Sequence, residues 1–155
     1  MRPRPDASLL TFVCFCPTFF CVLSPHLLAV KSDLDPPSLA AGTIVDVNVN
    51  FDLDHTCTKD LSATLISPEG TSVELFDLGS YPFCSSDMES TTLDDDASTP
   101  IANGSNPFTG SYMPSGTLST LNGQDSAGVW TLMFYDDTIG DTGTLQSWSI
   151  DLVLE

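Results

Sequence analysis

Apolar and polar residues alternate most regularly near the C-terminus, over residues 128–135 and 144–154. A period of two is typical of β-strands, because successive side chains point to opposite faces, and it leaves one apolar face per strand to be buried. That face consists of Trp130, Leu132, Phe134, Trp148, Ile150, Leu152 and Leu154. Each tryptophan can bury roughly 150–250 Å² of surface. The pattern therefore predicts a hydrophobic core centred on the two tryptophans.

The same alternation predicts strands upstream. Residues 43–51 alternate cleanly, and a polar loop is predicted over residues 52–60. The residues of 43–51 predicted to face the core are Val45, Val47, Val49 and Phe51. Residues 61–67 and 72–78 are predicted to form a hairpin, because the Pro-Glu-Gly-Thr sequence between them favours a turn.

Strand signals are weaker in the loop-rich section 79–111, where they centre on Thr91 and Ile101. Residues 117–121 are predicted to be a short strand, followed by a turn at Asn122 and Gly123. The polar residues are mostly Thr, Ser, Asp, Asn and Gly, which suits strands and turns and disfavours helices. About 7–8 short strands predict an all-β fold, namely an antiparallel β-sandwich or jelly roll.

The charge of the chain is strongly one-sided, with 21 Asp and Glu against 4 Lys and Arg and a net charge of −17. A surface this acidic repels phosphate backbones and anionic lipid head groups, so we expect no nucleic-acid partner. It favours cations instead.

The first 31 residues differ in character from the rest. Arg2 and Arg4 precede an apolar run, residues 9–30, that contains no charged residue. This layout is typical of a secretory signal peptide, although the run is also long enough to span a bilayer. A non-native start is the third interpretation. We expect a leader over 1–31, secretion, membrane contact only through an uncleaved leader, a linker over 32–42 and one domain over 43–155.

Four sequence blocks then point to a family. They are His55-Thr56 with Asp60-Leu61 leading into LSATLISPEGT (61–71), TTLDDDA (91–97), PFTGSYMPSG (107–116) and GVWTLMFYDDTIGDTGTLQSWSIDL (128–152). Their order and spacing resemble the P domain, or Homo B domain, of kexin- and furin-like subtilisin-type proprotein convertases. The resemblance covers roughly residues 40–155. A first strand expected before residue 40 is poorly matched, which predicts an exposed sheet edge.

The resemblance implies a β-sandwich jelly roll without catalytic residues of its own. It also implies a role in serine-type endopeptidase proteolysis, in which the module stabilises or docks on a subtilisin-like protease domain. The alternative is a secreted adhesive or carbohydrate-binding module. In that case Tyr81, Phe83 and Tyr112 would offer aromatic faces to a ligand.

No catalytic triad is apparent in the sequence. The histidines are His26, in the apolar leader, and His55. A triad remnant built on Asp54 and His55 would need a third group and an oriented base. The favoured interpretation of His55 is a loop histidine that hydrogen-bonds the backbone.

Calcium is the predicted cofactor, because hard cations take six to eight oxygen ligands and acidic residues gather in the loops. Since the two ends of the 61–78 hairpin lie together, the loop before it and the loop after it are predicted to be neighbours. The candidate ligands of one shared ion are Asp54, Asp60, Asp94, Asp95 and Asp96. The alternative is a solvated acidic rim.

The same hairpin geometry suggests a disulfide. Counting outward from the turn places Cys57 opposite about residue 82, close to Cys84. A Cys57–Cys84 disulfide is therefore predicted for a secreted chain, and two free thiols are the alternative for a cytosolic one. Asn103 begins an Asn-Gly-Ser sequon, which predicts N-glycosylation in a eukaryotic secretory setting.

Overall fold

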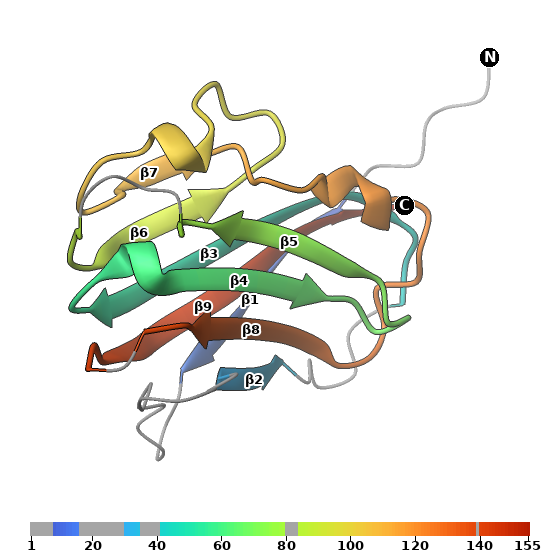
Figure 1. Cartoon of the computed structure of the whole chain (residues 1–155). Helices are drawn as coiled ribbons and strands as arrows, with labels where there is room; N and C mark the ends of the chain where they lie inside the picture. Colours follow the sequence, from blue (N-terminus) through green and yellow to red (C-terminus); the bar gives the residue numbers. More distant parts are fainter. Residues whose placement is uncertain (1–7, 16–29, 35–40, 80–83, 139) are drawn as a thin grey trace.

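The computed structural model describes residues 8–15, 30–34, 41–79, 84–138 and 140–155. Within them the chain forms two sheets that pack face to face, one with the strand order β1-β9-β3-β6-β7 and one with the order β2-β8-β4-β5 (Figure 1). Neighbouring strands are antiparallel except β6 and β7, which are parallel. The predicted β-sandwich is confirmed.

The five-stranded sheet consists of β1 (Ser8–Phe15), β9 (Gly143–Leu154), β3 (Ile44–His55), β6 (Met88–Leu93) and β7 (Gly110–Tyr112). The four-stranded sheet consists of β2 (Val30–Leu34), β8 (Trp130–Asp136), β4 (Leu61–Ile66) and β5 (Ser72–Asp77). Three short 3₁₀ helices lie in the loops: η1 (Thr58–Asp60), η2 (Ile101–Asn103) and η3 (Leu118–Leu121). No helix in the described part of the chain has the length and apolar character needed to cross a bilayer.

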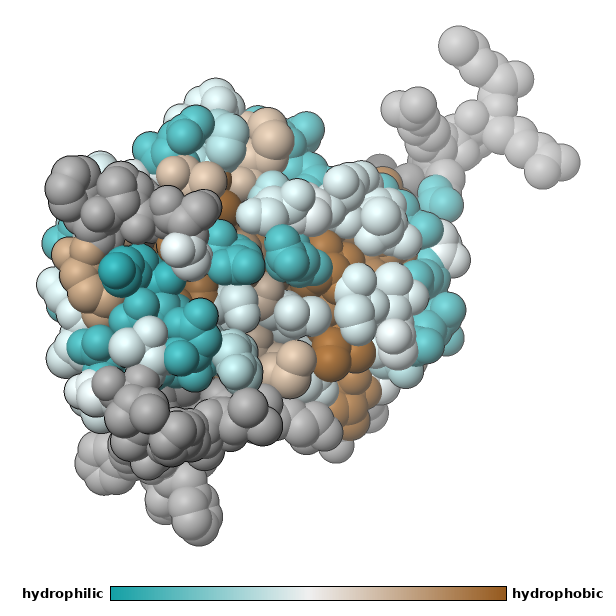
Figure 2. Space-filling model, in the orientation of Figure 1, coloured by the Kyte–Doolittle hydropathy of each residue, from teal (hydrophilic) through white to brown (hydrophobic). Residues whose placement is uncertain are grey.

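The core lies between the sheets and has the predicted centre. Trp130 on β8 and Trp148 on β9 are each only 2% exposed. Beside them Phe51, Phe76 and Phe134 form an aromatic cluster, with the rings of Phe51 and Phe134 meeting edge to face at 5.5 Å. These residues come from both sheets, so the cluster holds the two layers together. The face over the four-stranded sheet is mostly polar, with apolar surface gathered in a few places (Figure 2).

The start of β3 departs from the predicted alternation. The pairing with β9 shifts between Ile44 and Asp46, so Val45 is an extra residue on β3. This bulge directs Ile44 into the core and leaves Val45 40% exposed, whereas Val47, by contrast, is buried as predicted. The prediction for Val45 was wrong because a bulge changes the facing of one residue without changing the apolar sequence.

Two segments have a different secondary structure from the predicted one. The loop predicted over 52–60 is strand as far as His55, because β9 is long enough to pair with β3 over that length. Residues 118–121 form η3 and not a strand. The buried Leu118 and Leu121 are three residues apart, which matches one 3₁₀ turn, and the carboxylate of Asp95 accepts hydrogen bonds from two backbone N–H groups at its start.

The N-terminal segments supply the outer strands. β1 pairs with β9 along its length, and β2 pairs with β8. The linker predicted over 32–42 is therefore wrong for its first residues, which belong to β2. The predicted exposed sheet edge is not found at β8 or β9, because β2 pairs with the edge of β8 and β1 pairs with the edge of β9. Such pairing satisfies backbone groups that an open edge would leave without partners. Whether residues 1–31 are a leader stays a prediction.

The aromatic cluster gives a direct test of what stabilises the sandwich. Phe134→Ala is expected to lower the free energy of unfolding by about 3–5 kcal/mol, because it leaves a cavity between the sheets. Tyr135→Ala, one position along β8 at a side chain 38% exposed, is the matched control and should change it by less than about 0.5 kcal/mol. Urea unfolding followed by tryptophan fluorescence measures both. Equal effects of the two variants would contradict the assigned facing of β8.

Candidate functional site

Polar residues cluster at the end of the sandwich where β3 and β8 finish, which we call the loop end. His55, the last residue of β3, meets Asp136, the last residue of β8, with 3.3 Å between Nε2 and Oδ2. Both side chains are buried. Since β3 and β8 belong to different sheets, this pair links the two layers through a polar contact.

The other ring nitrogen of His55 is also engaged. Its Nδ1 accepts a hydrogen bond from the backbone N–H of Cys57 at 3.1 Å, so the proton of a neutral ring lies on Nε2 and points to Asp136. The backbone of His55 is in turn paired with Asp87. With both nitrogens occupied inside the structure, His55 fits the predicted backbone-binding role. Its carboxylate partner is Asp136 and not Asp54.

A glycine is needed beside this histidine. A Cβ atom added to Gly143 would overlap the imidazole carbon Cδ2 of His55 and the backbone oxygen of Asp54. Gly143 opens β9 directly opposite His55 in the register. The Gly-Asp-Thr-Gly sequence that ends at Gly143 therefore allows the close approach of β9 to the imidazole ring.

Asp60 and Asp141 bring two carboxyl groups together at the loop end. Burial raises the pKa of Asp60, a hydrogen bond with Thr138 opposes this, and the nearby Asp141 carboxyl raises the pKa further. Asp141 also accepts a hydrogen bond of 2.7 Å from the Thr56 hydroxyl. This contact ties the loop after β3 to the loop before β9.

The disulfide lies next to Asp60. Cys57 and Cys84 are bonded, with 4.9 Å between their Cα atoms, which is the pairing predicted from the hairpin. A carboxylate oxygen of Asp60 and the two sulfur atoms all lie within 4.8 Å of one another. The disulfide closes the loop end by joining the segment after β3 to the segment before β6.

The remaining predicted calcium ligands lie elsewhere. Asp54 is exposed, and its carboxylate accepts a hydrogen bond from Gln146. Asp94, Asp95 and Asp96 lie near Asp46. Burial raises the pKa of Asp46, a hydrogen bond with the backbone of Val47 opposes this, and the three nearby carboxylates raise the pKa further.

Asp46 and Asp54 are eight residues apart on β3, or about 26 Å at 3.3 Å per residue. The Asp94–Asp96 run and the loop end are therefore at opposite ends of the strand. The idea of one ion shared by all five residues is wrong. The five residues are separated because β6 runs antiparallel to β3 and carries the chain away from the loop end before Asp94 is reached.

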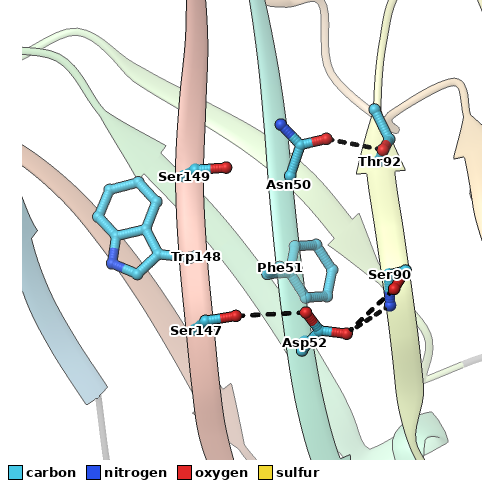
Figure 3. A pocket seen from close by; sticks show the side chains of 8 residues that line it. All are labelled: Asn50, Phe51, Asp52, Ser90, Thr92, Ser147, Trp148 and Ser149. Carbon is cyan, nitrogen blue, oxygen red and sulfur yellow. Dashed lines mark hydrogen bonds between the residues drawn. The ribbon is translucent and has the colours of Figure 1, made fainter. Parts of the chain in front are cut away.

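A second polar feature is a pocket of about 190 Å³ on the outer face of the five-stranded sheet. Figure 3 shows two rows of side chains that cross β9, β3 and β6, with the core residues Phe51 and Trp148 behind them. The first row is Ser149, Asn50 and Thr92, and the second is Ser147, Asp52 and Ser90. Sequence reasoning missed this pocket, since it assigned Asp52 to a loop and Ser90 and Thr92 to a loop-rich section, and it treated the other positions as the solvent side of strands.

The other predicted positions are placed as follows. Asn103 is exposed in η2, and its glycosylation stays a prediction. Tyr112 is half-buried and packs on Phe108 with 6.1 Å between ring centroids, so its ring supports the core. Tyr81 and Phe83 lie outside the described residues.

A family model described as the proprotein convertase P-domain matches residues 44–152. The chain belongs to this family. The match spans β3 to β9 and thus contains the loop end and the pocket of the P domain. A search of curated proteins finds no match.

Two solved structures share the fold of this P domain. They are the serine protease of Aeromonas sobria and the complex of that protease with its chaperone, each with a TM-score of 0.64 and 17% sequence identity. Each alignment covers 100% of this chain and 28% of the Aeromonas chain. At this identity the likeness shows the fold alone, and the P domain spans just over a quarter of that protease.

The raised pKa of Asp60 gives a pH-dependent prediction. A carboxyl group with a raised folded-state pKa stabilises the fold below its unfolded pKa of about 3.8, and this contribution is lost as the pH rises through the folded-state value. Asp60→Asn should therefore unfold at a higher temperature than the parent chain at pH 7, by about 2–4 °C for roughly 1 kcal/mol, and the difference should vanish below pH 4.

Melting curves recorded between pH 3.5 and 7.5 with a chelator present measure this difference. Asp137→Asn, at an exposed carboxylate of the same loop end, is the control and should show no such trend. A stability gain for Asp60→Asn that is equal at all pH values would show that charge at Asp60 is not its cause.

Proposed function

We propose that this chain acts as a non-catalytic module that stabilises or docks on a subtilisin-like serine protease domain. The family match over residues 44–152 carries the proposal. The fold likeness to one part of the Aeromonas sobria serine protease adds support. The likeness covers 28% of that protease, so the rest of the protease lies outside the part that resembles this chain.

The structure of the loop end supports a binding role over an enzymatic one. The Nδ1 lone pair of a neutral His55 ring accepts the backbone N–H of Cys57, and Nε2 faces Asp136, so His55 has no free lone pair with which to activate a nucleophile. The core and the His55–Asp136 pair join the two sheets, and the disulfide joins two loops. Links of this kind reduce the conformational freedom that is lost on docking, which suits a stabilising module.

The test fuses the chain to the C-terminal side of a subtilisin-like catalytic domain encoded in the same genome. The fusion is expected to raise the melting temperature of the catalytic domain by about 4 °C or more, because contacts made only in the folded state add to its stability. Differential scanning calorimetry and residual activity on a peptide substrate after heating measure the effect.

Two controls make this outcome specific. Phe134→Ala in the fused module should remove the gain, because the sandwich is then destabilised while the linker and most of the surface remain. An unrelated β-sandwich of similar size, fused in the same way, should give no gain. A gain of equal size from the unrelated module would overturn the proposal.

We further propose that calcium binds at the loop end, with Asp60 and Asp141 as ligands. The support is their proximity, since the repulsion that helps to raise the pKa of Asp60 would be relieved by a divalent cation. Millimolar calcium should raise the melting temperature of the parent chain but not that of Asp141→Asn. This variant keeps an oxygen that can accept the Thr56 hydroxyl. A midpoint unchanged by calcium or chelator would remove the idea.

We also propose that the chain is secreted. The disulfide between Cys57 and Cys84 supports it, because such bonds persist in oxidising compartments and are rare in the cytosol.

A further inference from the structure

The pocket on the outer face lies where the five-stranded sheet is irregular on both sides of one residue, Asp52. On the β6 side, the register moves from Phe51 opposite Thr91 to Leu53 opposite Met88, so two residues of β6 face Asp52 alone. Bulges of this kind distort the sheet locally and are frequent beside binding sites.

On the β9 side, the register moves from Asp52 opposite Ser147 to Leu53 opposite Leu145, which leaves Gln146 as an extra residue. The two neighbours of β3 are thus bulged at the same level. Ser90, in the β6 bulge, has a φ of 49°, a left-handed conformation that is uncommon outside glycine. The strain and both bulges coincide with the pocket.

The carboxylate of Asp52 is held in place by its own chain. Its Oδ1 accepts a 2.6 Å hydrogen bond from the backbone N–H of Ser90, and its Oδ2 accepts the Ser147 hydroxyl at 3.2 Å (Figure 3). A carboxylate has about four acceptor sites, so capacity for further donors remains. The orientation of Asp52 is fixed before any ligand arrives.

The rest of the lining is also rich in acceptor oxygens. Asn50 donates its amide to Asp151 and accepts the Thr92 hydroxyl, so its amide is fixed on both sides. The hydroxyl of Ser149 points toward Asn50 (Figure 3). Hydroxyl oxygens of serine and threonine can accept hydrogen bonds while donating their own. A ligand that donates several hydrogen bonds would match this lining.

The charges around the pocket indicate the sign of the charge on the ligand. Among residues whose side chains the structure describes, Lys59 is the one lysine or arginine, and no ion pair joins it to Asp52. The outer face of β3 carries Asp46, Asp52 and Asp54 in line. Together with the net charge of −17, this face attracts a cation and repels an anion.

We propose that the pocket binds the positively charged side chain of an arginine or lysine on a partner polypeptide, with the Asp52 carboxylate as its counter-ion. Arginine fits better, since its guanidinium offers five donors to a wall of oxygen atoms. A saccharide fits less well, because the aromatic rings behind the pocket, Phe51 and Trp148, are buried in the core and offer no stacking face. This inference is independent of the proposed docking on a protease.

The experiment titrates the isotope-labelled chain with a five-residue peptide that has one central arginine and capped ends. The matched ligand has citrulline, which has the same shape without the charge. NMR is expected to show shifts at residues 90–92 and 147–149, with arginine binding at least ten times more tightly than citrulline. A lysine peptide should lie between the two.

Two variants locate the counter-ion. Asp52→Asn keeps an oxygen for the Ser90 N–H and removes the charge, and it should weaken arginine binding at least tenfold. Asp54→Asn makes the same change two residues along the same face, outside the pocket, and should alter the affinity less than twofold. Ser149→Phe, which fills the pocket away from the bulges, should abolish binding and covers the case in which Asp52→Asn fails to fold.

Four results would overturn the proposal. One is equal affinity for the arginine and citrulline peptides. Another is an equal loss for Asp52→Asn and Asp54→Asn, which would show attraction by the whole acidic surface. The third is unchanged affinity in folded Ser149→Phe. Binding of neutral oligosaccharides at residues 90–92 and 147–149, with no binding of the arginine peptide, would assign the pocket to saccharides.

Discussion

The pairing of β3 with β9 is the constraint on which the rest of the structure depends. It joins segments about 100 residues apart in sequence, as the hydrogen bond between Asn50 and Asp151 illustrates. One face of this pair supplies Phe51 and Trp148 to the core, and the other face forms the floor of the pocket. Its last register positions place Gly143 against His55 and so shape the loop end. Non-local pairing of this kind forms late and slowly, since long loops must close first.

Alternation in the sequence was enough to predict the sandwich and its centre. Trp130 and Trp148 each lie on the apolar face of an alternating strand, and both are buried in the core. What alternation could not show is where a strand gains one residue. Val45, the bulges around Asp52 and the extension of β3 to His55 all depend on which residues of a distant strand lie opposite. A single sequence does not contain that information.

The acidic residues also show what a single sequence cannot predict. Asp60, Asp94 and Asp95 look equivalent in the sequence, as members of acidic loops. In the structure the carboxylate of Asp95 accepts a hydrogen bond at the start of η3, and that of Asp94 accepts one from the backbone N–H of Asp96. Asp60 is buried beside the disulfide. Local hydrogen bonding by aspartate explains two of these roles. Counting carboxylates therefore overestimated the metal site, whereas the hairpin argument for Cys57 and Cys84 succeeded because it used a distance along two paired strands.

The His55–Asp136 contact has a consequence for how the domain opens. Its proton on Nε2 lies between two side chains that are buried and that belong to different sheets. Since both side chains are buried, this proton can exchange with solvent only when the structure opens at the loop end, while Nδ1 accepts the N–H of Cys57. Exchange of this imidazole proton therefore reports opening at the loop end. Backbone amides within either sheet can stay protected through the same event.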